Sequence, residues 1–153
     1  QWCWAACAEM ILKYWNIPIS QEEIVYRIKG AFNDEAANYY EIVASLNGTA
    51  VSNNGAVVNV NSQTMGVTVE NILTDLYEDR PLLLAYNTGA GGHAVVLTAI
   101  NFRMIETYYG EDVQLVSVTV RDPWPDRPSK SIWNADELAA RTNFMARVYV
   151  NHA

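Results

Sequence analysis

The order in which helical and strand patterns follow one another constrains this chain most. The first third has the features of helices, with good helix formers after Trp2, a capping-box pattern from Ser20 to Glu23, and Gly30 as a stop. Most of the remainder has the β-branched and aromatic composition of strands, interrupted by Asn- and Gly-rich turns. This order predicts an α+β fold, in which an N-terminal helical layer packs on a C-terminal antiparallel sheet.

The same patterns predict the individual elements. Helices are expected over residues 2–15, 20–30, 35–46, 69–78 and 134–141, and strands over residues 56–60, 81–86, 93–102, 113–121 and 144–150. A Gly-rich loop at residues 88–92 joins two of these strands, and a turn at residues 109–112 is expected to make the next two a hairpin. Because the chain has 153 residues and no linker or repeat, we expect one domain, residues 1–153.

Composition and charge exclude several function classes. Hydrophobic residues make up 50% of the chain and charged residues 18%, which is typical of a globular protein, and no apolar run is long enough for a membrane-spanning helix. The net charge of −7 repels phosphate backbones, so we expect no nucleic-acid partner. Cys3 and Cys7 are too few for a disulfide scaffold, and His93 and His152 form no ligand-spaced pair, so we expect no metal and no cofactor.

Cys3 is the first candidate for catalysis, because it lies where the first predicted helix begins. A thiol at a helix N-terminus feels the positive end of the helix dipole, which favours the thiolate by about 0.3–1 kcal/mol. That contribution is below about one pKa unit, so full activation needs a cationic partner as well. With such a partner we expect Cys3 to react as a thiolate well below about pH 8.5, the ordinary pKa of a free thiol. The alternative is that Cys3 packs as a small hydrophobic residue in a core.

His93 and Asp122 are the candidates for that partner and for the group that orients it. His93 follows a Gly-Gly pair at the start of an apolar strand, and Asp122 ends a later strand just before Pro123. With a hairpin turn centred near residues 107–108, position 93 lies opposite position 122, where the carboxylate can accept a hydrogen bond from one imidazole nitrogen. Taken alone, each residue also fits a structural role, His93 bonded to a loop and Asp122 capping a turn.

Three motifs in this order resemble those of a known family. The segments Trp2-Cys-Trp-Ala-Ala6, Gly92-His-Ala-Val-Val96 and Asp122-Pro-Trp-Pro125 are similar to motifs of the compact bacterial papain-like cysteine peptidases. These include the C39-like peptidases and a group typified by a plant-pathogen effector, and the likeness covers essentially the whole chain. It implies a papain-like fold in which Cys3 is the nucleophile, His93 the general base and acid, and Asp122 the orienting residue.

The resemblance also bears on residues around the three motifs. In papain-like folds an aromatic ring often shields the contact between the histidine and its orienting residue, and Trp124 is close enough to Asp122 in the sequence for that role. Trp124 and Trp133 fit equally well as core or turn-anchoring residues. Substrate contacts are expected from Trp4, Gly91, Gly92 and Trp124.

Two features near the N-terminus depart from the family pattern. The family places a glutamine several residues before the nucleophile, where its amide joins the oxyanion hole, whereas Gln1 is only two residues before Cys3. Either Gln1 does this in a shifted geometry, or the corresponding glutamine lies upstream. In a rival register Cys7 is the nucleophile, six residues after Gln1, but the family follows its nucleophile with Trp and Cys7 is followed by Ala8. We therefore favour Cys3.

These observations predict a cysteine peptidase that hydrolyses peptide or protein substrates through an acyl-enzyme. Two alternative functions are consistent with the same residues. One is a transglutaminase-like acyltransferase, in which an amine replaces water. The other is a catalytically weak or inactive C39-like peptide-binding module, against which the retention of Cys3, His93 and Asp122 argues. We expect a monomer that is secreted or extracellular after processing.

Overall fold

The computed structural model describes residues 2–87, 92–125 and 128–153, and within them seven strands form one antiparallel sheet with the order β1-β2-β7-β3-β4-β5-β6. The strands are β1 (Gly48–Val51), β2 (Val57–Met65), β3 (Leu82–Asn87), β4 (Gly92–Thr107), β5 (Gly110–Arg121), β6 (Lys130–Asn134) and β7 (Thr142–His152). The helices are α1 (Cys3–Tyr14), α2 (Gln21–Lys29), α3 (Tyr39–Ala44), α4 (Val69–Tyr77) and α5 (Ala135–Arg141).

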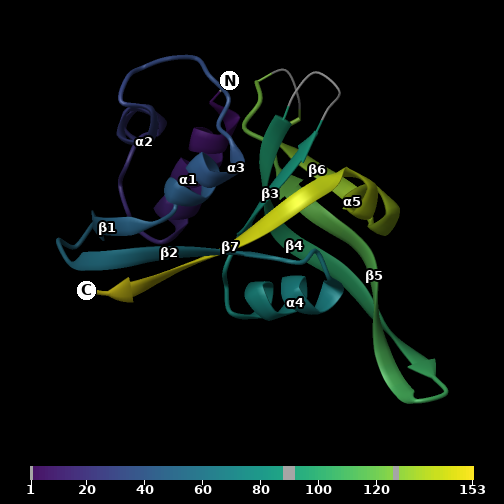
Figure 1. The fold of residues 1–153 in the computed structure, drawn as a ribbon. Helices are drawn as coiled ribbons and strands as arrows, with labels where there is room; N and C mark the ends of the chain where they lie inside the picture. The colour runs from purple at the N-terminus through teal and green to yellow at the C-terminus, as the bar shows by residue number, and fades with distance from the viewer. Residues whose placement is uncertain (1, 88–91, 126–127) are drawn as a thin grey trace.

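Different helices cover the two faces of the sheet (Figure 1). On one face α1, α2 and α3 form a core with every second residue of β4, namely Ala94 and Val96. On the other face α4 and α5 pack against the residues between, Val95 and Leu97. The predicted fold class, helices before an antiparallel sheet, is confirmed, and the two later helices add a layer on the opposite face.

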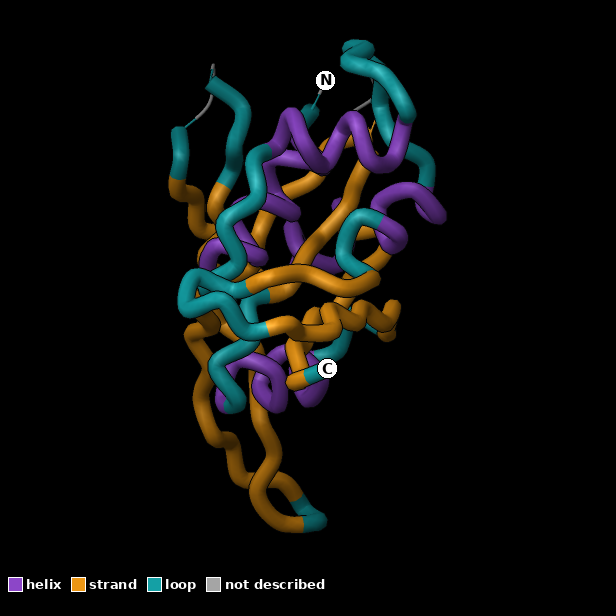
Figure 2. Tube along the Cα trace, turned by 90° about the vertical axis from the view of Figure 1, so that its left-hand side faces the viewer, coloured by secondary structure: helices purple, strands orange, loops and turns teal. Residues whose placement is uncertain are grey.

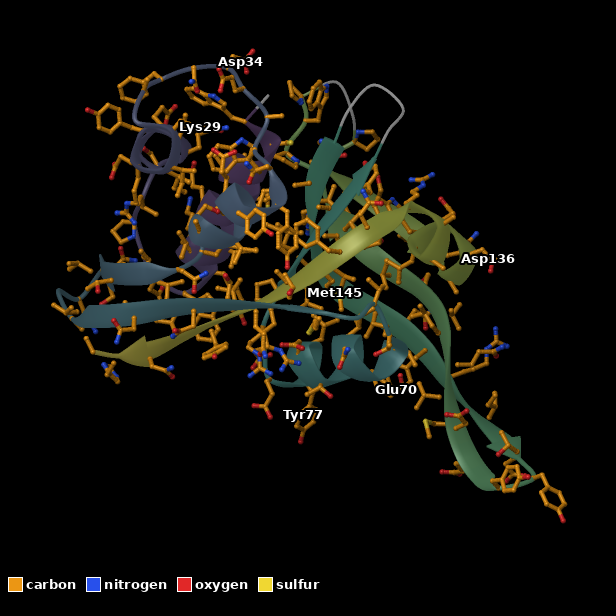
Figure 3. All side chains as sticks on the ribbon, viewed as in Figure 1. Lys29, Asp34, Glu70, Tyr77, Asp136 and Met145 are labelled. Atoms are coloured by element: carbon orange, nitrogen blue, oxygen red, sulfur yellow. The ribbon has the colours of Figure 1, made fainter. Side chains whose placement is uncertain are left out.

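The side chains of α4 show this division clearly. Glu70 and Tyr77 lie on the outer side of the helix in Figure 3, and both are exposed. Ile72 of the same helix is fully buried, in the core that also contains Met145 of β7. One apolar stripe on a short helix is enough to hold it against the sheet.

The central strand β3 explains a pattern in the sequence that does not alternate. Leu82, Leu83 and Leu84 are consecutive and all fully buried, because helices cover both faces of the sheet at this strand. Leu83 faces α1, whereas Leu82 and Leu84 face the opposite core. A continuous apolar run is typical of a strand that is buried on both sides.

Several elements differ from the predicted ones. The strand expected over residues 56–60 extends to Met65 as β2. The third helix begins only after Asn38, whose side chain accepts the Glu41 N–H in a capping box, so residues 35–37 lie outside it. The edge strands β1 and β6 were not predicted, because an edge strand with one exposed side lacks a sustained alternation.

The hairpin of β4 and β5 extends well beyond the rest of the sheet as a two-stranded arm, seen at the bottom of Figure 2. Its turn consists of Tyr108 and Tyr109, which are 96% and 94% exposed. The predicted turn at residues 109–112 is therefore wrong, since Gly110 already pairs with Thr107 and begins β5. Gly110 has a φ of 115°, which a glycine adopts without steric cost, so the glycine marks the exit from the turn.

None of the helices among the described residues is long and apolar enough to cross a membrane.

Candidate active site

Cys3 is the first residue of α1, and this helix begins without a side-chain cap. Trp2 occupies the N-cap position, whereas the other four described helices are capped by Ser20, Asn38, Thr68 and Asn134. The N–H groups of a first helical turn have no acceptor within the helix. In α1 the N–H of Trp4 is directed at the Cys3 sulfur instead. The start of α1 therefore supplies one donor to the thiol.

His93 and Asp122 form a buried pair. His93 Nε2 lies 2.8 Å from Asp122 Oδ1, and the two side chains are 2% and 8% exposed. This contact implies that Nε2 carries a proton and donates it to the carboxylate. The other nitrogen, Nδ1, is buried and has no hydrogen-bond partner among the described residues. Nδ1 is therefore the nitrogen left to accept a proton from a nucleophile.

The carboxylate is itself held in place from the backbone. Asp122 Oδ1 accepts the Trp124 N–H at 2.9 Å, and the Asp122 N–H donates to the Ser129 carbonyl at 3.0 Å. Pro123 ends the ladder with β4 at this point, so the chain turns while the side chain stays beside the sheet.

His93 and Asp122 meet in a register that differs by two residues from the predicted one. The turn at residues 108–109 and the pair Val96–Arg121 place position 93 opposite position 124, beyond the end of the ladder. Asp122 is then a diagonal neighbour on the same face, within reach of the imidazole. A shift of one residue would have moved Asp122 to the opposite face, whereas a shift of two leaves it on the same face. The predicted contact is therefore present, although the predicted pairing is wrong.

Aromatic rings enclose His93. Tyr86 and Trp124 each pack edge-on against the imidazole, with ring centroids 5.4 Å away. Trp133 packs edge-on against Tyr86 at 5.2 Å and so supports the site indirectly. Tyr86 was not predicted at the site, although it pairs with His93 in the ladder between β3 and β4, and the symmetry of that hairpin was the available signal. The rings limit water access to the His93–Asp122 bond.

Cys3 lies against the strand that carries His93. The N–H groups of Ala94, the residue after His93, and of Trp4 are directed at the sulfur. Burial raises the pKa of the Cys3 thiol, the two N–H groups lower it, and the negative charge of Asp122 raises it. The sequence predicted a lowered pKa from the helix dipole and an imidazolium. That direction is wrong for the thiol in this structure, because burial was not taken into account. Burial exceeds the effect of the N–H groups, so the pKa of the Cys3 thiol is raised overall.

Cys7, the rival nucleophile, is inaccessible. Its side chain is 0% exposed within the core between α1 and the sheet. Burial raises its pKa well above the ordinary range, and the nearby Cys3 and Asp122 raise it further. The structure therefore favours Cys3 over Cys7.

The remaining predicted site residues separate into three groups. Trp4 is 1% exposed and its indole N–H donates to the Glu35 carbonyl, so the expected substrate contact is wrong because the ring belongs to the core. Gly92 pairs with Asn87 at the start of β4, directly before His93, and its contact with substrate stays a prediction. Gln1 and Gly91 lie outside the described residues, so their roles stay predictions.

An open cavity of about 430 Å³ adjoins Cys3. One side comes from the start of α1 and α2, and the other from the segment after β5 that includes Trp124. The size falls within the range of about 300–1,000 Å³ that is usual for ligand pockets. The described ranges contain no group of three or more His, Cys, Asp or Glu residues that could hold a metal ion.

Two comparisons with known proteins found a match, one to a protein family and one to a solved structure. A family model described as Peptidase_C39 like family matches residues 1–152. The fold is similar to that of the peptidase domain of Streptococcus ComA, described as a bi-functional ABC transporter involved in a quorum sensing pathway, with a TM-score of 0.63. The identity is 12%, and the match covers 99% of this chain and 91% of that one, which shows a shared fold. No curated protein matches the sequence.

Proposed function

Because this chain belongs to the Peptidase_C39 like family, we propose that it is a papain-like cysteine peptidase that hydrolyses peptide bonds with Cys3, His93 and Asp122. The observation that carries the proposal is that the two nitrogens of the His93 imidazole have different surroundings. Nε2 is bonded to Asp122 at 2.8 Å, and Nδ1 is buried without a partner among the described residues, next to the residue whose N–H faces the Cys3 sulfur. A histidine held in this tautomer is ready to act as a general base.

The proposed reaction follows the usual course for an activated thiol. His93 Nδ1 takes the proton from Cys3, and the sulfur attacks the carbonyl carbon of the scissile bond. The C–N bond breaks as the imidazolium gives its proton to the leaving amine, which leaves a thioester on Cys3. Water then gives a proton to His93 and attacks the thioester, so that the acid is released and the thiol restored. Asp122 stabilises the imidazolium in both steps without taking the proton itself.

Stabilisation of the developing oxyanion is assigned to the uncapped start of α1. Backbone N–H groups at a helix N-terminus are suited to a negative oxygen, and the N–H of Cys3, at the start of α1, is the donor proposed here. A second donor from a glutamine amide, either Gln1 or one upstream, remains part of the proposal. Loss of one such donor costs about 10²–10³-fold in turnover.

The test compares peptide cleavage by the wild-type protein with that by Cys3→Ala, followed by mass spectrometry of a defined peptide mixture. We expect hydrolysis products from the wild type and none from Cys3→Ala. Cys7→Ala is the matched control, because it removes the only other thiol, and it should retain the wild-type products. Cleavage by Cys3→Ala, or its loss in a folded Cys7→Ala, would refute the assignment.

The same mixture with an added primary amine separates hydrolysis from acyl transfer. A hydrolase yields mainly free carboxylic acids, whereas an acyltransferase yields amides of the added amine. Alkylation of Cys3 without any product from either mixture would instead support a binding module that has kept its thiol.

A further inference from the structure

The cavity beside Cys3 has a lining that selects for a particular kind of substrate side chain. The rings of Trp2 and Trp124 line it together with Pro123, Pro125 and the methyl group of Ala6. Its other lining residues are Cys3 and Gln21, so no described residue of the lining carries a permanent charge. An apolar ring would be removed from water against other rings there, whereas a charged side chain would find no oppositely charged partner among the described lining residues.

We propose that this cavity receives an aromatic side chain of the substrate, next to the scissile bond. The inference rests on the proposed function, since Cys3 lines the cavity and attacks that bond. Aromatic rings prefer edge-to-face or offset contacts with other rings, and Trp2 and Trp124 offer such contacts from the helical and the sheet sides of the cavity.

The walls are tied to rigid elements, which a specificity pocket requires. The Trp2 indole N–H donates to the Asn33 carbonyl at 2.7 Å, and the Trp124 ring packs on His93. Gln21, the first residue of α2, is fastened to α1 because its backbone N–H donates to Glu9 Oε2 at 2.7 Å. Its neutral side-chain amide can both donate to and accept from a peptide main chain.

Ala6 is the residue that leaves room for a ring. It lies one helical turn after Cys3 on the same side of α1, so a larger side chain there projects into the cavity next to the sulfur. A single extra methylene in an apolar pocket changes discrimination by about 10-fold to 200-fold. Ala6→Leu keeps good helix propensity and should reduce the space for an aromatic substrate side chain.

The first measurement is a cleavage-site profile on a library of natural peptides, read on both sides of each cut. We expect aromatic residues to be enriched at one position beside the scissile bond, and Ala6→Leu to lower cleavage at those sites by about 10-fold or more relative to sites with small residues. The matched control is Ala140→Leu, an exposed position on α5 outside the cavity lining, which should keep the wild-type profile.

A second measurement does not depend on turnover. Iodoacetamide alkylates Cys3 at alkaline pH in any state of activity, and N-acetyl-phenylalaninamide in the cavity should slow that reaction while N-acetyl-alaninamide does not. Ala6→Leu should lose this protection and Ala140→Leu should keep it. Protection without cleavage would support the pocket and refute the peptidase assignment. Cleavage with no aromatic preference, or equal alkylation with both amides, would overturn the pocket.

Discussion

At the scale of single residues, opposing influences act on the Cys3 thiol. Burial raises its pKa, and the N–H groups of Ala94 and Trp4 only partly offset that effect. In the proposed mechanism the proton passes to His93, and the positive charge of the resulting imidazolium favours the thiolate. The reactivity of Cys3 should therefore depend on His93 more than on the helix dipole.

The first prediction follows from this dependence. In wild-type protein the rate of Cys3 alkylation by iodoacetamide should reach its half-maximal value at a lower pH than in His93→Ala. Without the imidazolium, burial and the charge of Asp122 keep the thiol protonated to a higher pH than an ordinary thiol. The measurement is the alkylation rate against pH by mass spectrometry. His152→Ala, at an exposed residue near the C-terminus, should leave the profile unchanged, and identical profiles for wild type and His93→Ala would contradict the dependence on His93.

The second prediction concerns Asp122 as a positioning residue. His93→Ala should lower kcat by at least about 10²-fold, because it removes the proposed general base. Asp122→Ala should lower kcat less, with KM nearly unchanged, since the carboxylate bonds to the imidazole rather than to substrate. Asp122→Asn should recover much of the activity, because its amide oxygen can still accept from His93 Nε2 and from the Trp124 N–H. Equal losses for the Ala and Asn variants would indicate a role for the charge alone.

At the scale of secondary-structure elements, predictability depends on whether the signal is local. The caps Ser20 and Asn134 and the stop at Gly30 were read correctly, because each acts on residues within the next or the previous turn. The position of the arm's turn was predicted wrongly. Two tyrosines give no turn signal, and the glycine after them led to a predicted turn at residues 109–112. Edge strands such as β1 gain their pairing from a partner that the local sequence does not reveal.

The predictability of the site residues also depends on whether their contacts are local. The meeting of His93 and Asp122 could be predicted because both lie at the open end of one hairpin and an error of two residues preserves the face. The burial of Trp4 could not be predicted from the sequence, because it depends on residues 33–35 folding over the start of α1. The packing of Tyr86 on His93 likewise requires the register of a second hairpin.

The third prediction tests a cap. Asn134 Oδ1 accepts the Glu137 N–H at 2.8 Å, and Glu137 Oε1 accepts the Asn134 N–H at 3.3 Å. Asn134→Ala should lower the free energy of unfolding by about 1 kcal/mol, whereas Asn134→Ser should lose much less because serine caps about as well. Urea unfolding of the three proteins gives the comparison. A loss as large for serine as for alanine would show that packing, not the cap, is what asparagine contributes.

At the scale of the whole molecule, a buried ionic cluster joins α4 to the central strands. Asp75 is fully buried on α4, with Oδ2 2.7 Å from Arg147 Nη2 of β7 and Oδ1 2.8 Å from Arg80 Nε. Arg80 follows α4 directly and leads into β3, so one carboxylate ties the helix, the following turn and the sheet together. This cluster lies in the layer opposite α1, so it stabilises the face of the sheet on which Cys3 does not lie.

The fourth prediction is that Asp75→Ala destabilises the fold strongly. Removing the shared carboxylate leaves two guanidinium groups partly buried without their partner, which typically costs about 3–5 kcal/mol. Glu78→Ala, at an exposed carboxylate at the end of α4, should change the free energy of unfolding by no more than about 0.5 kcal/mol. Thermal and urea unfolding provide the values. A loss below about 1 kcal/mol for Asp75→Ala would show that the cluster is not needed to hold α4.

If Cys3 carries the acyl group during cleavage, as proposed, the intact mass of the protein in a reaction stopped rapidly with acid should show it. The wild type should show an adduct equal in mass to the acyl part of the substrate, located on Cys3 by peptide mapping. The adduct should be absent from Cys3→Ala and unaffected by Cys7→Ala. Cleavage of the substrate by Cys3→Ala, or an adduct located on any other residue, would show that Cys3 is not the nucleophile.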